Sequence, residues 1–111
     1  MNIERIEHGT LEDGGAIYVY KLTNANGASV TLCNIGAGIV SIVVPDKDGK
    51  MTDVVLGYKD LASYIGDGPC AGKVPGRFSN RIKEGKFSID GKEFQLVLNT
   101  GDGKHHLHGG N

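Results

Sequence analysis

Three of the chain's four histidines stand together near its C-terminal end, in the sequence His-His-Leu-His at residues 105–108, which two glycines follow. An imidazole can donate a hydrogen bond, accept one or move a proton near neutral pH, so it suits a substrate oxygen. His108 fits this role best, because Leu107 can anchor in the core while the glycines let a ligand approach the backbone. We expect His105 and His106 to lie exposed in a loop.

A cluster of histidines also raises the hypothesis of a metal site. Zinc sites combine such histidines with Cys, Asp or Glu at recognised spacings. The segment shows no such spacing, and neither Cys33 nor Cys70 belongs to a CxxC pair or lies at ligand spacing from a histidine. We therefore predict no metal site and no disulfide, with Cys33 as a reduced core thiol and Cys70 in a glycine- and proline-rich loop.

A second cluster of chemically capable residues is the segment GRFSNRI at residues 76–82, which holds Arg77, Asn80 and Arg81. Arginine offers five donors in a rigid fork and stays charged, so it can hold a carboxylate, a phosphate or the oxygens of a sugar. The alternative is structural: the arginines pair with acidic surface groups, and Asn80 caps a turn.

Other classes of function find no support in the sequence. Gly36-Ala37-Gly38 lacks the third glycine and the following helix of a dinucleotide site, and neither a Walker loop nor a GxSxG elbow is present, so we predict no cofactor. The formal net charge is −1 with both signs interspersed, which argues against nucleic acid as a partner. No apolar run is long enough to span a bilayer, and the N-terminus lacks a signal-peptide pattern, so the expected location is cytoplasmic.

Short segments rich in β-branched and aromatic residues, separated by turn residues, predict strands along most of the chain. An Asp-Gly pair at residues 90–91 between two alternating segments is the clearest hairpin signal. The predicted strands are residues 16–22, 29–35, 39–44, 52–57, 86–89 and 93–98.

The remaining segments complete an all-β prediction. Residues 60–64 predict one helical turn with Asp60 as its N-cap, and the four glycines and two prolines of residues 66–76 predict a shaped loop. Short strands at regular intervals favour an antiparallel β-sandwich or barrel. We expect residues 1–111 to form part of one domain without an internal boundary, and self-association through uncovered strand edges is possible.

The order and spacing of the motifs resemble those of aldose 1-epimerases. The resemblance rests on GRFSNRI (76–82), GKFSIDGKEF (85–94), Asn99 and LHGG (107–110), which match the family's GRxxNRI and LHGG series. Residues 34–42 and 53–58 also resemble the family's opening strands. The chain is thus similar to the N-terminal portion of such a protein. One departure is the stretch from Gly101 to His106, which is longer than the family's usual asparagine-proline turn before LHGG.

The resemblance implies a large antiparallel β-sandwich that interconverts the α and β anomers of aldoses such as galactose and glucose without metal or organic cofactor. It also implies that Asn80, Arg81 and His108 bind the sugar. The family's glutamate base and histidine acid lie further along its sequence than Asn111, so the resemblance assigns no catalytic acid or base here and implies a chain inactive alone. Two alternatives stay open: a non-catalytic carbohydrate-binding module and a purely structural β-domain.

Overall fold

A computed structural model describes residues 1–12, 14–66 and 68–110 of the protein. The contacts gather into two compact units, Met1–Val74 and Pro75–Asn111, and each is described by itself. The expectation of one domain without an internal boundary concerns the complete fold and stays a prediction.

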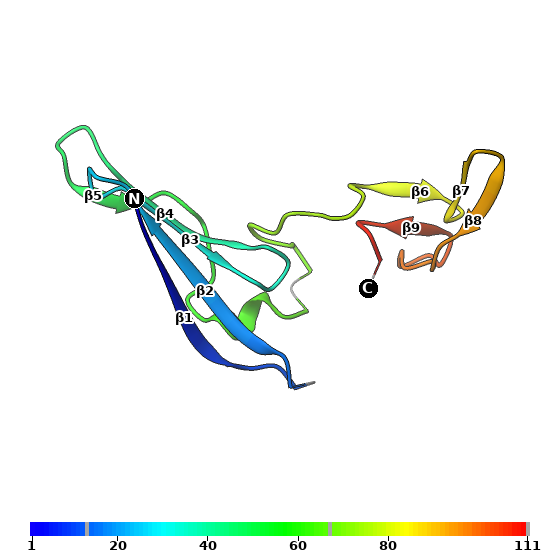
Figure 1. The fold of residues 1–111 in the computed structure, drawn as a ribbon, viewed down its shortest axis with the longest axis horizontal. Coiled ribbons are helices and arrows are strands. Elements are labelled where there is room, and N and C mark those ends of the chain that lie inside the picture. The colour runs from blue at the N-terminus through cyan, green and yellow to red at the C-terminus, as the bar shows by residue number, and fades with distance from the viewer. Residues whose placement is uncertain (13, 67, 111) are drawn as a thin grey trace. The chain divides into compact units, whose positions relative to one another are not determined.

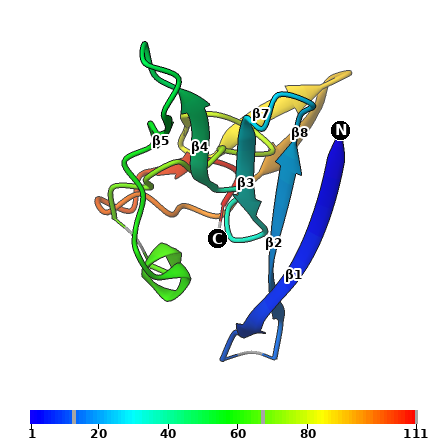
Figure 2. The ribbon, with the colours of Figure 1, turned by 90° about the vertical axis from the view of Figure 1, so that its left-hand side faces the viewer.

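The first unit is built on a five-stranded antiparallel sheet whose strands lie side by side in the order of the sequence (Figure 1; Figure 2). One tight turn joins the second strand to the third, and another joins the fourth to the fifth. Both turns are held by a side-chain oxygen that accepts backbone N–H groups. The side chains of Asn24 and Asp46 each accept two backbone N–H bonds, at 2.9–3.0 Å, from residues two and four positions further on. The strands are β1 (Asn2–Thr10), β2 (Ala16–Thr23), β3 (Ser29–Cys33), β4 (Ile39–Pro45) and β5 (Met51–Asp53).

The core of this unit lies on one face of the sheet. Ile17 and Val19 of β2 are buried there, and Cys33 of β3, opposite Val19 in register, is buried beside them. Cys33 was predicted as a core thiol, and this is confirmed. Successive side chains of a strand alternate between faces, which is why two residues two positions apart share this one.

A single turn of 3₁₀ helix, η1 (Leu61–Tyr64), completes the core. Its N-cap is Asp60, whose side chain accepts the Ala62 N–H, so both the predicted turn and its cap are confirmed. Tyr64 is 0 % exposed, and its hydroxyl accepts the Tyr58 N–H at 3.3 Å. A Cβ at Gly57 would lie 2.8 Å from that hydroxyl, so the packing requires glycine there.

The first strand, β1, was not predicted. All of its described side chains are exposed, and apart from Ile3, Ile6 and Thr10 its residues carry little β propensity. It pairs with β2 along its length, with a register shift between Glu7 and Gly9. Charged side chains and a bulge are devices that protect an edge strand from pairing with other chains. Self-association through strand edges stays a prediction.

Two predicted strands are shorter in the structure. Strand β3 ends at Cys33: the Asn34 N–H still donates to the Tyr18 carbonyl at 3.2 Å, but the Asn34 side chain replaces its carbonyl, accepting the Tyr18 N–H and donating to the Ala16 carbonyl. Strand β5 covers only Met51–Asp53: the Val54 N–H still donates to the Ile42 carbonyl at 2.9 Å, but the Ile42 N–H binds the Asp53 carboxylate, which also accepts the Val55 N–H.

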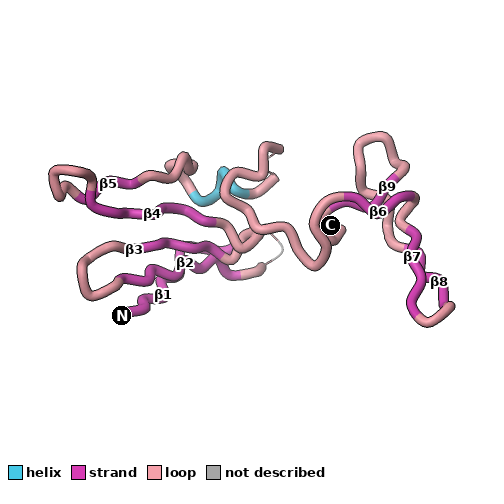
Figure 3. The backbone as a smooth tube through the Cα atoms, turned by 90° about the horizontal axis from the view of Figure 1, so that it is seen from above, coloured by secondary structure: helices cyan, strands magenta, loops and turns pink. Residues whose placement is uncertain are grey.

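The second unit consists of two antiparallel ribbons, shown with the loops in Figure 3. The predicted hairpin around Asp90-Gly91 is present as β7 (Lys86–Ile89) and β8 (Lys92–Gln95), with Phe87 stacked on Phe94 at 5.2 Å. Strand β8 ends three residues earlier than predicted: the Leu96 N–H still donates to the Gly85 carbonyl at 2.8 Å, but the partner strand begins only at Lys86, after left-handed backbones at Glu84 and Gly85. The other ribbon pairs β6 (Arg81–Lys83) with β9 (His105–Leu107).

The described residues thus form antiparallel strands with one short 3₁₀ turn, and the all-β prediction is confirmed. Within these residues no helix has the length and apolar character needed to cross a membrane.

Candidate sugar-binding site

The predicted site residues meet at one end of the β6–β9 ribbon. Arg81, the first residue of β6, faces Leu107, the last residue of β9. Asn80 precedes the one strand and His108 follows the other. Antiparallel pairing therefore brings together residues that are 28 positions apart in the sequence.

Asn80 and His108 bond to each other twice. The His108 N–H donates to the Asn80 carbonyl at 3.1 Å, and the Asn80 N–H donates to the His108 Nδ1 at 3.1 Å. Both residues have left-handed backbones, with φ of 68° and 54°. Such a conformation is unfavourable for a non-glycine residue, and the two bonds hold it in place.

The second of these bonds defines the tautomer of the His108 ring. A nitrogen that accepts a hydrogen bond carries no proton, so the neutral imidazole carries its proton on Nε2. The side chain is exposed. Nε2 is thereby a hydrogen-bond donor available to a ligand oxygen.

Arg81 joins the pair through its side chain, because its Nη1 donates to the Asn80 Oδ1 at 3.3 Å. Among the residues that the structure describes, neither Arg77 nor Arg81 forms an ion pair with a carboxylate. The structural alternative, in which these arginines pair with acidic surface groups, therefore gains no support. Arg81 keeps donors for a ligand.

Small-molecule sites are commonly clefts of about 300–1,000 Å³, and the pocket beside Arg81 measures about 560 Å³. Its lining combines two guanidinium groups with aromatic and aliphatic side chains. These lining residues are Arg77, Phe78, Arg81, Ile82, Phe87, Leu96, His106 and Gly109. The sequence singled out its arginines but gave no sign that Phe78 or Phe87 would share a pocket with them.

The expectation that His105 and His106 lie exposed in a loop was wrong. Both belong to β9: His105 is half-buried, and His106 is 3 % exposed. The His106 Nδ1 lies 2.8 Å from the Val97 carbonyl and must donate to it, since a carbonyl only accepts. The Nδ1 of His105 accepts the Glu84 N–H at 3.2 Å. The alternation of apolar residues that usually marks a strand is missing here, which hid it in the sequence.

The turn before β9 is organised by a carboxylate. The pKa of Asp102 lies below its ordinary value, because the Thr100 hydroxyl donates to it at 2.6 Å and the Lys104 N–H donates at 3.1 Å. A smaller effect in the same direction comes from His105. Thr100 also accepts the His105 N–H at 3.0 Å, so this network fixes the start of the strand.

As for metals, no group of three potential His, Cys, Asp or Glu ligands lies together in the described ranges 1–12, 14–66 and 68–110. The Nδ1 atoms of the three clustered histidines are all engaged with backbone groups.

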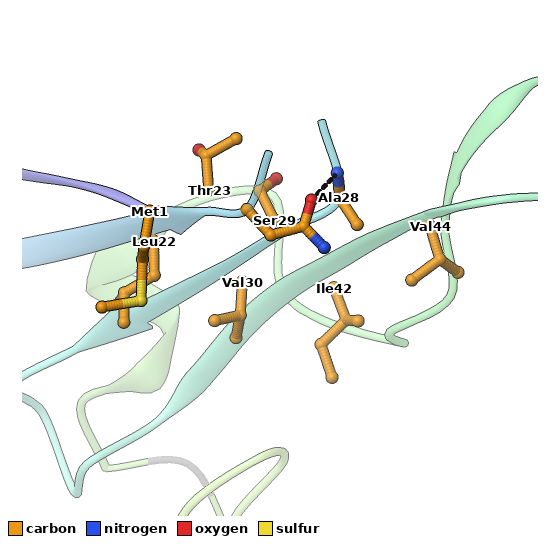
Figure 4. A pocket seen from close by; sticks show the side chains of 9 residues that line it. Met1, Leu22, Thr23, Ala28, Ser29, Val30, Ile42 and Val44 are labelled. Atoms are coloured by element: carbon orange, nitrogen blue, oxygen red, sulfur yellow. Dashed lines mark hydrogen bonds between the residues drawn. The ribbon is translucent and has the colours of Figure 1, made fainter. Parts of the chain in front are cut away.

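The first unit contains a separate groove of about 330 Å³ on its sheet, shown in Figure 4. Side chains of Leu22, Val30, Ile42 and Val44 give it an apolar surface, with Met1 at one end. No ionisable side chain lines it, so it offers contact area but none of the groups that acid–base chemistry needs.

Two solved structures with a similar fold carry epimerase in their names. The GalM/aldose epimerase homologue from C. elegans matches with a TM-score of 0.68 and 38% identity, over 81% of this chain and 27% of that chain. Galactose 1-epimerase from Lactobacillus acidophilus matches with a TM-score of 0.73 and 25% identity, over 98% of this chain and 30% of that chain. The fold therefore places this chain among all-β proteins similar to these two solved structures.

The sequence comparisons give the family. The family model described as aldose 1-epimerase matches residues 18–111, and galactose mutarotase from Rattus norvegicus is 36% identical over 110 residues. The chain belongs to the aldose 1-epimerase family, as its motifs predicted. The match covers 99% of this chain and 32% of the rat protein, so the chain spans about a third of the length of that relative.

Proposed function

We propose that this chain supplies the sugar-binding part of an aldose 1-epimerase site, in which Asn80, Arg81 and His108 hold an aldose such as galactose or glucose. The observation that carries the proposal is the hydrogen-bonded cluster of these residues beside an arginine-lined pocket. The names of the relatives, galactose mutarotase and galactose 1-epimerase, support the choice of substrate.

The three residues offer complementary hydrogen bonds to a sugar. The guanidinium of Arg81 and the Nε2–H of His108 are donors, so each can bind a ring or hydroxyl oxygen. Asn80 contributes chiefly by orienting both, through its side-chain oxygen and its backbone N–H. Groups held in this way bind without reorganising, which favours a fixed substrate pose.

The reaction itself needs two proton transfers. A base removes the proton of the anomeric hydroxyl while an acid protonates the ring oxygen, and the bond between C1 and the ring oxygen breaks. Rotation about C1–C2 and closure in the reverse sense, which returns both protons, give the other anomer. The resemblance places the family's base and acid beyond the position of Asn111. We therefore assign binding, and not proton transfer, to the described residues.

Calorimetric titration of the purified chain with galactose tests the binding. Arg81→Ala is expected to weaken the affinity about tenfold or more, because hydrogen bonds from a charged donor contribute about 1.5–3 kcal/mol. Lys83→Ala is the matched control, since Lys83 is an exposed cation on the same strand but does not line the pocket.

Equal losses in both variants would point to a general effect of positive charge and would contradict the proposal. A wild-type chain that is folded and shows no galactose binding would do the same. A non-catalytic carbohydrate-binding module would share the binding but is not favoured by the family membership.

A further inference from the structure

Beyond the three residues that hold the sugar, we propose that Asn99 is the positioning residue of this site and acts through the backbone of Leu107 to fix the ring of His108. The proposal rests on the proposed function for its link to sugar binding, but its structural part can be tested separately. Nothing in the fold requires an amide at this position for packing alone, so its hydrogen bonds are the feature to explain.

The side chain of Asn99 binds both polar groups of one backbone residue. Its Oδ1 accepts the Leu107 N–H at 2.6 Å, and its Nδ2 donates to the Leu107 carbonyl at 3.0 Å. A primary amide presents its acceptor and donor side by side, as a neighbouring strand would, so Asn99 extends the pairing of β9 from a residue outside any strand.

Leu107 is the last residue of β9, and His108 follows it directly with a φ of 54°. A left-handed conformation at a residue with a Cβ is costly and persists only where its surroundings determine it. The Leu107 carbonyl belongs to the peptide plane that leads into His108. Fixing both sides of Leu107 therefore fixes the direction in which the next residue leaves the strand.

The geometry of the Asn80 contact depends on that direction. The Nδ1 of His108 reaches the Asn80 N–H only if the ring leaves the strand at this angle, and this bond sets the Nε2–H tautomer. Asn99 is half-buried, which shields its two bonds from competing water. Its own main chain is held as well, because the Asn99 N–H donates to the His105 carbonyl at 3.0 Å.

Two variants separate the donor from the acceptor. Asn99→Leu removes both bonds: the half-buried Leu107 N–H loses this partner, and the Leu107 carbonyl keeps only the Gly110 N–H, at 3.1 Å. Asn99→Asp keeps an acceptor for the Leu107 N–H but places a second acceptor opposite its carbonyl. Asn24→Ala is the matched control, since Asn24 also accepts two backbone N–H bonds but lies in the first unit.

The first measurement is the ¹⁵N NMR signature of the His108 ring in the full chain at neutral pH. We expect one neutral tautomer, protonated on Nε2, in the wild type and in Asn24→Ala, and averaging between tautomers in Asn99→Leu. The second is the galactose affinity, which should fall about tenfold in Asn99→Leu and less in Asn99→Asp.

An unchanged ¹⁵N signature of the His108 ring in folded Asn99→Leu would overturn the proposal. If Asn99→Leu does not fold, the same result in folded Asn99→Asp would overturn it. An unchanged signature with lost galactose binding would also overturn it, because Asn99 would then contact the sugar itself. If the wild type binds no galactose, the proposed function fails, while the His108 signature still decides whether Asn99 positions the ring.

Discussion

At the level of single residues, His105 and His108 use the same ring nitrogen in the same way. In each, Nδ1 accepts the backbone N–H of a residue with a left-handed backbone, Glu84 with φ of 52° and Asn80 with φ of 68°. Glu84 and Asn80 flank β6, so the imidazole that begins β9 and the imidazole that follows it hold the two ends of β6. Of the two rings only His108 is exposed, and its partner Asn80 also accepts a hydrogen bond from Arg81.

The two functions of His108 can be separated by substitution. In His108→Asn the amide oxygen can replace Nδ1 as acceptor for the Asn80 N–H, and Asn tolerates the left-handed backbone, but the donor at Nε2 is lost. We expect the Asn80 amide to stay protected from hydrogen exchange while galactose binding weakens about fivefold, since a neutral hydrogen bond contributes about 1 kcal/mol. Amide exchange and calorimetry check both parts. Wild-type affinity in this variant would show that Nε2 does not contact the sugar.

Residue types in the sequence were enough to identify the members of the cluster but not their bonds. Asn80, Arg81 and His108 were predicted from their chemistry and from the family motif, and the structure brings them together. The burial of His106 could not be predicted, because it depends on a hydrogen bond to Val97, a partner that only the folded chain places beside it. Single-residue chemistry says what a side chain can do, while its partner decides what it does.

At the level of elements, the turn between β6 and β7 depends on one glycine. Gly85 is buried with φ of 63°, and an added Cβ would lie 2.8 Å from the Leu96 carbonyl and 2.9 Å from the Leu98 side chain. Gly91, in the β7–β8 turn, has φ of 77° but no atom within 4 Å of such a Cβ.

This contrast predicts unequal effects of alanine. Gly91→Ala should destabilise its unit by about 1 kcal/mol, the cost of the left-handed backbone alone. Gly85→Ala should cost about 1–3 kcal/mol more, since the neighbouring backbone must shift to make room. Denaturant unfolding followed by amide signals of residues 81–107 measures both. Equal losses would mean that the turn accommodates the methyl group without displacement.

The turn before β9 should respond to acid. The pKa of Asp102 is lowered in the folded chain, so the stabilisation it gives is fully present above its ordinary value of about 3.9 and is lost as pH falls through the lowered value. Thr100→Val removes the hydroxyl that contributes most, and the pKa of Asp102 should rise towards its ordinary value. Carboxyl ¹³C titration by NMR follows the change. An Asp102 pKa that does not change in Thr100→Val would contradict the assignment of the lowered pKa to the Thr100 hydroxyl.

The sequence predicted those elements whose structure is determined by nearby residues. It missed those whose structure is determined by pairing with a distant strand. The β7–β8 hairpin and the η1 cap were predicted because Asp-Gly and Asp60 act within a few residues. Strands β1, β6 and β9 were not, since their polar residues lack an alternating pattern and their structure comes from a partner strand.

At the level of the whole molecule, the chain has the fold of the aldose 1-epimerase family and belongs to it. The next point is which residues bind the sugar and which transfer protons. The chain matches galactose mutarotase from Rattus norvegicus over 99% of its own length and 32% of that protein's length. Its described residues offer hydrogen-bond donors for a sugar, but the motif match assigns none of them as the acid or the base of the reaction.

We therefore expect the purified 111-residue chain to bind galactose without accelerating its mutarotation. Binding alone lowers the energy of substrate and transition state alike, and only a group that moves a proton in the transition state speeds ring opening. Polarimetry of freshly dissolved α-D-glucose or α-D-galactose measures the rate, with Arg81→Ala as a control for trace contaminating enzyme. A rate enhancement that Arg81→Ala abolishes would place an acid or a base among residues 1–111. His108 would then be the first residue to substitute, because its ring is exposed and carries a proton on Nε2.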